Sequence, residues 1–383
     1  MKVYKPPMGW NSWNTFARNI DEKLIMESAD TLVETGLADC GYNYIVIDDC
    51  WALKERDENG KLVPDPEKFP HGIKYVSDYI HSKGLKFGMY SCAGTLTCAG
   101  FPGSYQHEFD DAASFAKWGV DFLKYDYCFR PTTVPGDILY KRMSIALKNS
   151  GRDILFSACS WGADETREWI GETGSHMWRT TGDIWDNWES LKKLSKVGLE
   201  NAKYGGISRF ADMDMLIVGM CGNGNVGLGG CNFEEYKMHF SLWALLNSPL
   251  MIGCDIRNMS DETKQILMNK EVIAINQDEE SNVPFNIKFT KVAAHKNDDI
   301  MLYAKMLSNG DYAIGAFNFS DDETNFWQTN FTTEKLGLDE ATGKTLLMKE
   351  LWTNETFIVK NGIVTFNLKP HTCKLFRAKV VDK

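Results

Sequence analysis

The sequence lacks the long apolar runs and basic clusters that are typical of membrane and nucleic-acid-binding proteins. No stretch approaches the roughly 18 uninterrupted apolar residues of a membrane span, and the first residues contain no apolar segment typical of a signal peptide. The formal net charge is −10 without any run of Lys and Arg, so we expect neither nucleic acid nor membrane as a partner. We expect a cytoplasmic protein, or a secreted one if a leader was removed.

Cysteine and histidine are also sparse. The 10 cysteines among 383 residues are too few for a disulfide scaffold, and no Cys-x-x-Cys pair is present. The 7 histidines show neither His-x-His nor His-Glu-x-x-His spacing, so we expect no metal. The absence of a Gly-x-Ser-x-Gly motif argues against a serine hydrolase.

One glycine-rich segment, Gly222 to Gly227, matches a dinucleotide-binding fingerprint as a string of letters. The next acidic residue at a predicted strand end is Asp255, which lies well beyond the roughly 20 residues that this fingerprint requires. We therefore expect no cofactor.

The chain contains 43% hydrophobic and 25% charged residues, the balance of a folded globular protein. Its first part alternates helical segments with short runs that are apolar throughout, which is typical of strands in a parallel sheet covered on both faces. Eight such units close most simply into a (β/α)8 TIM barrel, expected over residues 1–280. The predicted strands are residues 8–13, 44–47, 85–89, 120–125, 154–157, 176–179, 209–212 and 250–253.

Two helical segments have apolar residues at helical spacing, which predicts the faces that they bury. These residues are Ile73, Val76 and Ile80 in the first segment, and Phe109, Ala112, Ala113 and Ala116 in the second.

The pattern changes after residue 280, where the helical period disappears. Residues 300–307 and 312–317 flank Asn309-Gly310, and residues 357–359 and 363–366 flank Asn361-Gly362. Both arrangements predict β-hairpins. We expect residues 281–383 to form a small antiparallel β-sandwich domain.

Acidic and aromatic residues follow several predicted strands. In a TIM barrel the active site lies at the carboxyl ends of the strands. Glycoside cleavage requires two carboxyl groups there, together with polar and aromatic contacts to the sugar. The sequence therefore predicts a glycosidase, with a non-catalytic sugar-binding protein as the alternative. The residues expected at the strand ends are Trp13, Asp48, Asp49, Tyr90, Asp126, Arg179 and Asp212.

Eight motifs distributed over the predicted barrel resemble those of the melibiase family, glycoside hydrolase family 27, which contains α-galactosidases and α-N-acetylgalactosaminidases. The C-terminal part is only loosely similar. The motifs are residues 8–13 (MGWNSW), 47–51 (IDDCW), 69–73 (FPHGI), 97–104 (TCAGFPGS), 124–126 (KYD), 178–179 (WR), 212–216 (DMDML) and 272–278 (VIAINQD).

The resemblance implies a retaining mechanism in which Asp126 is the nucleophile and Asp183 is the acid/base. Asp126 lies two residues from Lys124, a cation that favours the ionised carboxylate. The alternative for Asp183 is a helix N-cap before Ile184-Trp185.

The resemblance also implies the sugar contacts. Asp48 and Asp49 match residues that bind the 4- and 6-hydroxyls, Lys124 matches a contact to the 3- and 4-hydroxyls, and Arg179 matches a contact to the 2-position. Trp13 and Tyr90 match walls of the site, where Cys98 and Met215 are also expected. Cys98 and Cys128 match a family disulfide, which a reducing compartment could leave as thiols. Some relatives form homo-oligomers, so a homo-oligomer is a possible assembly.

The segment after the fifth predicted strand bears on the sugar substituent. Animal galactosidases have Glu and Leu where this chain has Ser160 and Ala163, whereas N-acetylgalactosaminidases have Ser and Ala. Two small residues leave space for a 2-acetamido group, so the pattern favours substrates with terminal α-linked N-acetylgalactosamine (GalNAc). The alternative is a plain α-galactosidase that acts on terminal α-linked galactose.

Overall fold

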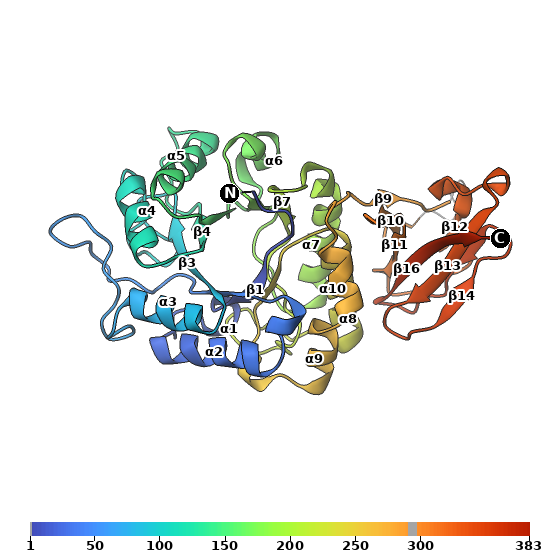
Figure 1. Cartoon of the computed structure of the whole chain (residues 1–383), viewed down its shortest axis with the longest axis horizontal. Helices are drawn as coiled ribbons and strands as arrows, with labels where there is room; N and C mark the ends of the chain where they lie inside the picture. The colour runs from blue at the N-terminus through green and yellow to red at the C-terminus, as the bar shows by residue number, and fades with distance from the viewer. Residues whose placement is uncertain (1, 290–296) are drawn as a thin grey trace.

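The structure is a computed structural model that describes residues 2–289 and 297–383. Figure 1 shows a barrel formed by the first part of the chain and a smaller β domain beside it. Within the described residues, no helix has the length and apolar character that crossing a bilayer requires.

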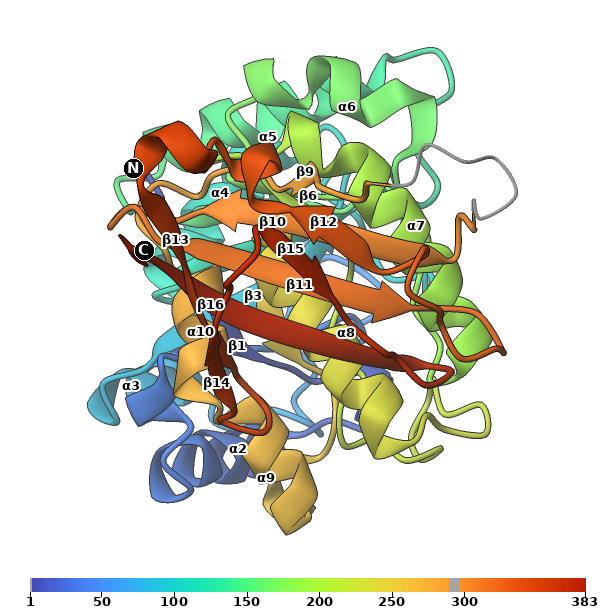
Figure 2. The same ribbon diagram turned by 90° about the vertical axis from the view of Figure 1, so that its right-hand side faces the viewer.

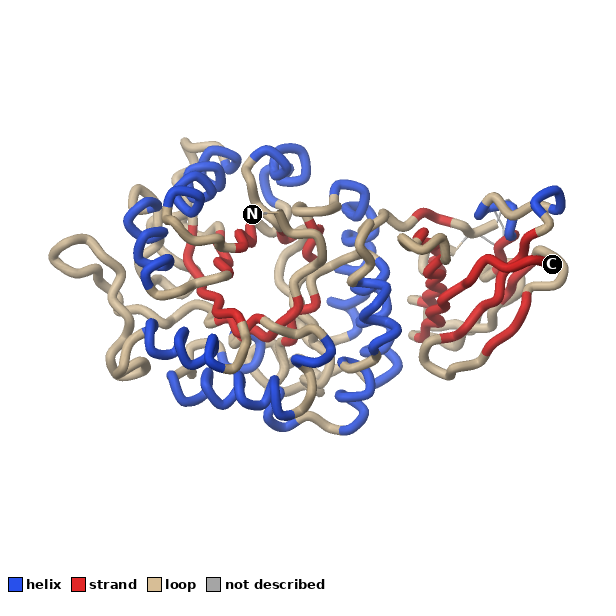
Figure 3. The backbone as a smooth tube through the Cα atoms, in the orientation of Figure 1, coloured by secondary structure: helices blue, strands red, loops and turns tan. Residues whose placement is uncertain are grey.

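Eight parallel strands form the barrel wall in the order β7-β6-β5-β4-β3-β2-β1-β8. The ring closes between β8 and the segment after β7, because Leu216 bridges Ile252 in parallel. Each strand overlaps one of the predicted segments, and the predicted TIM barrel is confirmed (Figure 3). The strands are β1 (Met8–Asn11), β2 (Tyr44–Val46), β3 (Lys86–Cys92), β4 (Phe122–Asp126), β5 (Leu155–Ala158), β6 (Met177–Arg179), β7 (Phe210–Asp212) and β8 (Leu250–Ile252).

Helices surround the strands on the outside of the ring (Figure 3). Side chains of Asp21, Asn187 and Asn232 accept hydrogen bonds from backbone N–H groups in the first turns of α2, α7 and α8, which fixes where these helices begin. The helices are α1 (Trp13–Phe16), α2 (Glu22–Glu34), α3 (Ile73–Ser82), α4 (Glu108–Lys117), α5 (Gly136–Asn149), α6 (Thr166–Trp169), α7 (Trp188–Asn201), α8 (Phe233–Leu245), α9 (Asp261–Leu267) and α10 (Lys270–Asn276).

The predicted buried face of α3 is confirmed, since Ile73, Val76 and Ile80 are buried. The predicted face of α4 is only partly correct: Ala112 is buried, but Phe109 is 57% exposed, and Glu108, Asp111 and Phe115 face the core in its place. Two carboxylates can occupy this face because Arg56 binds both oxygens of Asp111 at 2.7 and 2.8 Å, and Arg142 binds Glu108 at 3.0 Å. Apolar spacing alone does not reveal such pairing.

The C-terminal part forms the predicted antiparallel β-sandwich, with a six-stranded sheet in the order β14-β13-β16-β11-β10-β9 and a two-stranded sheet of β12 and β15. The division of the chain at residue 280 stays a prediction. The strands are β9 (Phe285–Asn286), β10 (Ile300–Met306), β11 (Tyr312–Asn318), β12 (Asn330–Thr332), β13 (Lys344–Glu350), β14 (Thr356–Ile358), β15 (Ile363–Thr365) and β16 (Thr372–Asp382).

Of the two predicted hairpins, the one formed by β10 and β11 is confirmed, with Met306 opposite Tyr312. The second hairpin is wrong, because β14 pairs with β13 and β15 pairs with β12. The Asn361-Gly362 turn connects the two sheets, so that Val359 and Val364 are buried in the same core from different sheets. A turn signal does not distinguish these two arrangements.

The β domain packs against the side of the barrel. Helix α8 lies against β16 and β11, as Figure 2 shows from the side of the β domain. At this interface His371 stacks on Trp188 with ring centroids 3.9 Å apart, and Trp352 donates a hydrogen bond to Ser241. The carboxyl ends of the barrel strands remain open.

Candidate active site

A cavity of about 200 Å³ lies at the carboxyl ends of the barrel strands. Parallel strands bring their carboxyl ends to one edge, so residues distant in the sequence meet here. Ten of the residues predicted for the site line this cavity, as does Cys128 of the predicted disulfide. The lining residues are Trp13, Asn14, Asp48, Asp49, Tyr90, Cys98, Lys124, Asp126, Cys128, Trp161, Arg179, Asp183, Asp214, Met215 and Val226.

Asp126 ends β4 and is buried, with 6% of its surface exposed. Its Oδ2 accepts a hydrogen bond of 2.9 Å from the Tyr90 hydroxyl, and its Oδ1 accepts one of 2.9 Å from the backbone N–H of Tyr127. Burial raises the pKa of Asp126 to about 6, although Lys124 and both hydrogen bonds oppose this shift. Asp126 is therefore an oriented carboxyl group that changes charge near pH 6.

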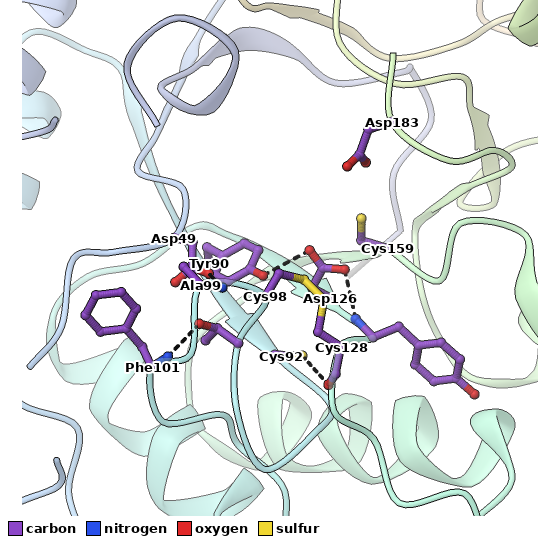
Figure 4. The surroundings of a disulfide bond; sticks show 12 residues. Asp49, Tyr90, Cys92, Cys98, Ala99, Phe101, Asp126, Cys128, Cys159 and Asp183 are labelled. Atoms are coloured by element: carbon purple, nitrogen blue, oxygen red, sulfur yellow. Dashed lines mark hydrogen bonds between the residues drawn. A yellow bond between two sulfur atoms is a disulfide. The ribbon is translucent and has the colours of Figure 1, made fainter. Parts of the chain in front are cut away.

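Asp183 lies in the loop after β6, and Figure 4 shows its carboxylate directed toward that of Asp126. Its Oδ1 accepts a hydrogen bond of 3.0 Å from Arg179, and its side chain is 63% exposed. Partial desolvation would raise the pKa of Asp183, but the charges of Arg179 and Lys124 outweigh it and lower the pKa. The N-cap alternative does not hold, because Asn187 caps the following helix, α7.

A second group of charges also lines the cavity. Lys124 donates a hydrogen bond of 2.8 Å to Asp48, which also accepts one of 2.8 Å from Asn11. Burial opposes the charged form of Lys124, but the carboxylate of Asp48 raises its pKa. Burial raises the pKa of Asp49, which accepts a hydrogen bond of 3.0 Å from the backbone N–H of Ala99. Cations and carboxylates held this way can bind several sugar hydroxyls at once.

Two predicted site residues, Ser160 and Ala163, do not line the cavity. Ser160 is fully buried, and its hydroxyl lies 2.7 Å from that of Thr166. Trp161 lines the cavity instead, and its backbone has a positive φ of 58°. The sharp turn at Trp161 thus directs the indole into the cavity, while its neighbour Ser160 faces the protein interior.

The sequence interpretation also missed Asp214. Its Oδ2 lies 3.0 Å from Arg179 and accepts a hydrogen bond of 2.7 Å from the backbone N–H of Ile184. Asp214 thereby fixes both Arg179 and the start of the loop that carries Asp183. The DMDML motif contains two aspartates, and of these the strand-end pattern predicts Asp212 for the site. Asp212 lines a separate, smaller cavity inside the barrel.

A disulfide bond joins Cys98, in the loop after β3, to Cys128, in the loop after β4, with Cα atoms 5.2 Å apart. The bond lies beside Asp126 (Figure 4). It connects two loops that contribute to the cavity wall.

Comparison with known proteins agrees with this architecture. Residues 5–278 match the family model described as α-galactosidase A, and residues 297–378 match the α-galactosidase C-terminal β-sandwich domain. The α-galactosidase of Coffea arabica is 44% identical over 375 residues, which cover 97% of this chain and 93% of the coffee protein.

Solved structures are similar as well. The crystal structure of α-galactosidase I from Mortierella vinacea has a TM-score of 0.88 at 34% identity, covering 98% of this chain and 97% of the other. An α-galactosidase from Saccharomyces cerevisiae, solved with raffinose, has a TM-score of 0.85 at 28% identity, covering 99% and 98%. From its fold, its sequence and these similarities, the chain belongs to the α-galactosidase (melibiase) family of glycoside hydrolases.

Proposed function

We propose that this protein is a retaining exo-α-galactosidase that removes terminal α-linked galactose from oligosaccharides or glycoconjugates. One observation carries the proposal: Asp126 and Asp183 line the same cavity, one buried and oriented, the other exposed beside an arginine. Two carboxyl groups in unlike surroundings are what cleavage of a glycosidic bond requires.

In the first step, the ionised carboxylate of Asp126 attacks the anomeric carbon. The bond between this carbon and the leaving oxygen breaks, and Asp183 transfers its proton to that oxygen. In the second step, Asp183 as the base removes a proton from water. The water oxygen then displaces Asp126 from the anomeric carbon, which returns the sugar with its original configuration.

The first step requires a protonated Asp183, whereas in the free site Arg179 keeps this group ionised. We infer that bound substrate shifts the protonation equilibrium of Asp183 toward the protonated form. A sugar 2-hydroxyl that accepts a hydrogen bond from Arg179 weakens the pair, and the leaving group covers Asp183 and excludes water. Both effects raise the pKa of Asp183, while Asp126, beside Lys124, loses its proton. One proton shared between two coupled carboxyl groups thus moves to the acid.

The sugar contacts follow from the positions of the charges. Asp48, Asp49 and Lys124 line the cavity and would bind the 3-, 4- and 6-hydroxyls, so an axial 4-hydroxyl is expected. Trp13 and Tyr90 would contact the apolar face of the ring. Cys98 and Met215 supply further wall contacts.

We propose galactose as the preferred sugar, whereas the sequence pattern at Ser160 and Ala163 favours GalNAc. The GalNAc prediction required Ser160 and Ala163 to leave space in the cavity, but neither lines it, and the large Trp161 does. An indole in the cavity wall leaves less room for an acetamido group than two small side chains would. The names of the similar proteins from Coffea arabica and Mortierella vinacea support this choice.

Two measurements test the proposal. Initial rates on nitrophenyl α-galactoside and nitrophenyl α-GalNAc should differ by at least tenfold in favour of the galactoside. Proton NMR of the first product should show α-galactose before mutarotation. A preference for GalNAc would contradict the sugar assignment, and release of β-galactose would contradict the double displacement.

A further inference from the structure

Three groups at the mouth of the cavity have the composition of a metal-ion site. The sulfur atoms of Cys98 and Cys128 and one carboxylate oxygen of Asp126 lie within 4.8 Å of one another. Figure 4 shows the disulfide directly beside the Asp126 carboxylate. While the disulfide is intact, the sulfurs are poor ligands, because thiolates rather than disulfides bind metals.

Reduction would change the donor set. A dithiol reductant supplies two electrons and two protons, which break the S–S bond and leave the thiols of Cys98 and Cys128, while the dithiol becomes a cyclic disulfide. Cys98 is exposed, so a reductant can reach its sulfur. The product is a pair of thiols beside a carboxylate.

Other contacts hold the two loops in place without the disulfide. The backbone N–H of Ala99 donates to Asp49 at 3.0 Å, and Lys54 donates to the carbonyl of Ala99 at 2.8 Å. On the other loop, the thiol of Cys92 donates to the carbonyl of Cys128 at 3.2 Å. The two sulfur atoms should therefore stay close to each other after reduction.

Gly94 allows the close approach of these loops. A Cβ atom at this position would lie 2.0 Å from the carbonyl oxygen of Cys128, a severe overlap. The loops thus pack backbone against backbone, which limits how far the sulfurs can separate.

The donor set suits a thiophilic divalent cation. Zn²⁺ binds thiolates at about 2.3 Å and carboxylate oxygens at about 2.0–2.2 Å. Two thiolates that move only slightly apart after reduction would therefore reach one ion together with the carboxylate. The Asp126 carboxylate already accepts hydrogen bonds from Tyr90 and Tyr127, the kind of outer contact that orients a ligand. Five carboxyl groups and two cationic side chains line the cavity, so its charge also favours a cation.

We propose that the reduced protein binds one thiophilic divalent cation, such as Zn²⁺, through Cys98, Cys128 and Asp126. Binding releases the two thiol protons and leaves a fourth position of the ion open to water. The bound ion occupies the Asp126 carboxylate and blocks hydrolysis, so the disulfide protects the site from metals. The inhibitory consequence rests on the proposed function, whereas the binding does not.

The binding test uses the full chain, reduced with dithiothreitol and then desalted without oxygen. Titration with Co²⁺ should give one equivalent bound, with a thiolate-to-cobalt charge-transfer band that one equivalent of Zn²⁺ abolishes. The oxidised protein should show no such band. Absence of the band in the reduced protein, or an equal band in the oxidised protein, would overturn the proposal, as would loss of the native circular dichroism spectrum on reduction.

Variants assign the ligands. Cys98→Ser and Cys128→Ser should each weaken Co²⁺ binding at least tenfold, and Asp126→Asn should do so while keeping both thiols. Cys221→Ser is the matched control, because Cys221 is an exposed free thiol and does not line the cavity. Weaker Co²⁺ binding in Cys221→Ser, with unchanged binding in the Cys98 and Cys128 variants, would overturn the proposal.

An activity measurement separates this site from the proposed function. One equivalent of Zn²⁺ should lower the hydrolysis rate of the reduced protein at least tenfold, a chelator should restore it, and the oxidised protein should be insensitive. Metal binding by a protein that hydrolyses no galactoside would support the site and refute the function. Hydrolysis that Zn²⁺ leaves unchanged in the reduced protein would refute the inhibitory site.

Discussion

The hydroxyl group of Tyr90 donates a hydrogen bond of 2.9 Å to Oδ2 of Asp126, and both residues are buried. Tyr90 lies in β3 and Asp126 ends β4, so the pairing of two neighbouring strands fixes the contact. The hydrogen bond stabilises the charged carboxylate, while burial raises the pKa of Asp126 to about 6. This balance determines the pH range in which the proposed nucleophile is ionised.

The first prediction concerns pH. Because the pair of Asp126 and Asp183 must hold one proton, which passes to Asp183 when substrate binds, kcat/KM should fall as the pH rises above about 6, where the free pair loses this proton. Tyr90→Phe removes a hydrogen bond that favours the charged form, so it should raise the pKa of Asp126 and move this alkaline limb to higher pH. The measurement is kcat/KM against pH for both proteins. An alkaline limb that stays in place would show that another group controls it.

The second prediction concerns the nucleophile. Asp126→Asn keeps the size of the side chain but removes its charge, and it should lower kcat by roughly 10⁴-fold or more. Galactose binding should remain measurable by calorimetry, because the other polar groups of the cavity are intact. Near-normal turnover in this variant would refute the assignment of Asp126. Such turnover would mean that other residues catalyse the reaction. The sugar-binding alternative predicts something different, namely no turnover by the wild type or by Asp126→Asn.

The third prediction concerns the acid/base. Asp183→Asn should abolish hydrolysis of substrates with sugar leaving groups, which need a proton, but should affect activated nitrophenyl galactosides much less. Azide should restore turnover of the activated substrate and give galactosyl azide, because a small anion needs no base. The measurement is the rate ratio between the two substrate types. Equal losses on both would argue against Asp183 as the acid.

The fourth prediction concerns the sugar substituent. Trp161→Ala should raise the rate on nitrophenyl α-GalNAc relative to the galactoside by about 10-fold, since enlarging a pocket changes discrimination by roughly 1–3 kcal/mol. Ser160→Ala is the matched control, because its hydroxyl faces Thr166 rather than the cavity, and it should leave the ratio unchanged. A change in the Ser160 variant alone would support the GalNAc preference predicted from Ser160 and Ala163.

The fifth prediction concerns the contact between the barrel and the β domain. Lys305, in β10, is fully buried and donates hydrogen bonds of 2.6 Å to Asn247 and to the carbonyl of Ile275. Burial lowers its pKa to about 7, whereas the side chain in the unfolded chain keeps its proton up to about pH 10.4. Between these values the unfolded state binds one more proton, so raising the pH should increase the contribution of Lys305 to stability.

The free energy of unfolding should rise by about 1.4 kcal/mol per pH unit through this effect, and this pH dependence should be absent in Lys305→Met. The measurement is the free energy of unfolding at pH 7 to 9, expressed as the difference between variant and wild type. Lys379→Met, at an exposed position of β16, is the control and should leave the slope unchanged. A wild-type slope retained in Lys305→Met would contradict a neutral amine at this position.

Sequence reasoning predicted the barrel because each wall strand is a short apolar run between helical segments, and this pattern depends on burial on both faces. The same pattern predicts that Asp48, Asp126 and Arg179 lie at one edge of the barrel, since all three follow or end such runs. The carboxyl ends of parallel strands lie together in any conformation of the loops. The positions of these three residues can therefore be predicted without knowing how the loops fold.

The sequence did not predict which side chains of the loops face the cavity. Ser160 and Trp161 are neighbours, and only the positive φ of Trp161 determines which of them faces the cavity. Residue type does not predict this backbone conformation, because left-handed values are uncommon for tryptophan. Asp214 was missed for a similar reason, since it lies beyond the regular part of β7, in a turn where its φ is 81°.

In the proposed mechanism Asp126 and Asp183 act in two successive steps. Between the steps, the galactosyl group is covalently bound to Asp126. Incubation with a galactosyl fluoride that carries a second fluorine at C5 should trap this intermediate, and peptide mapping by mass spectrometry should locate it. We predict one added sugar on the peptide that contains Asp126, and none in Asp126→Asn. A sugar attached to a different carboxyl group, or turnover without any adduct, would contradict the account.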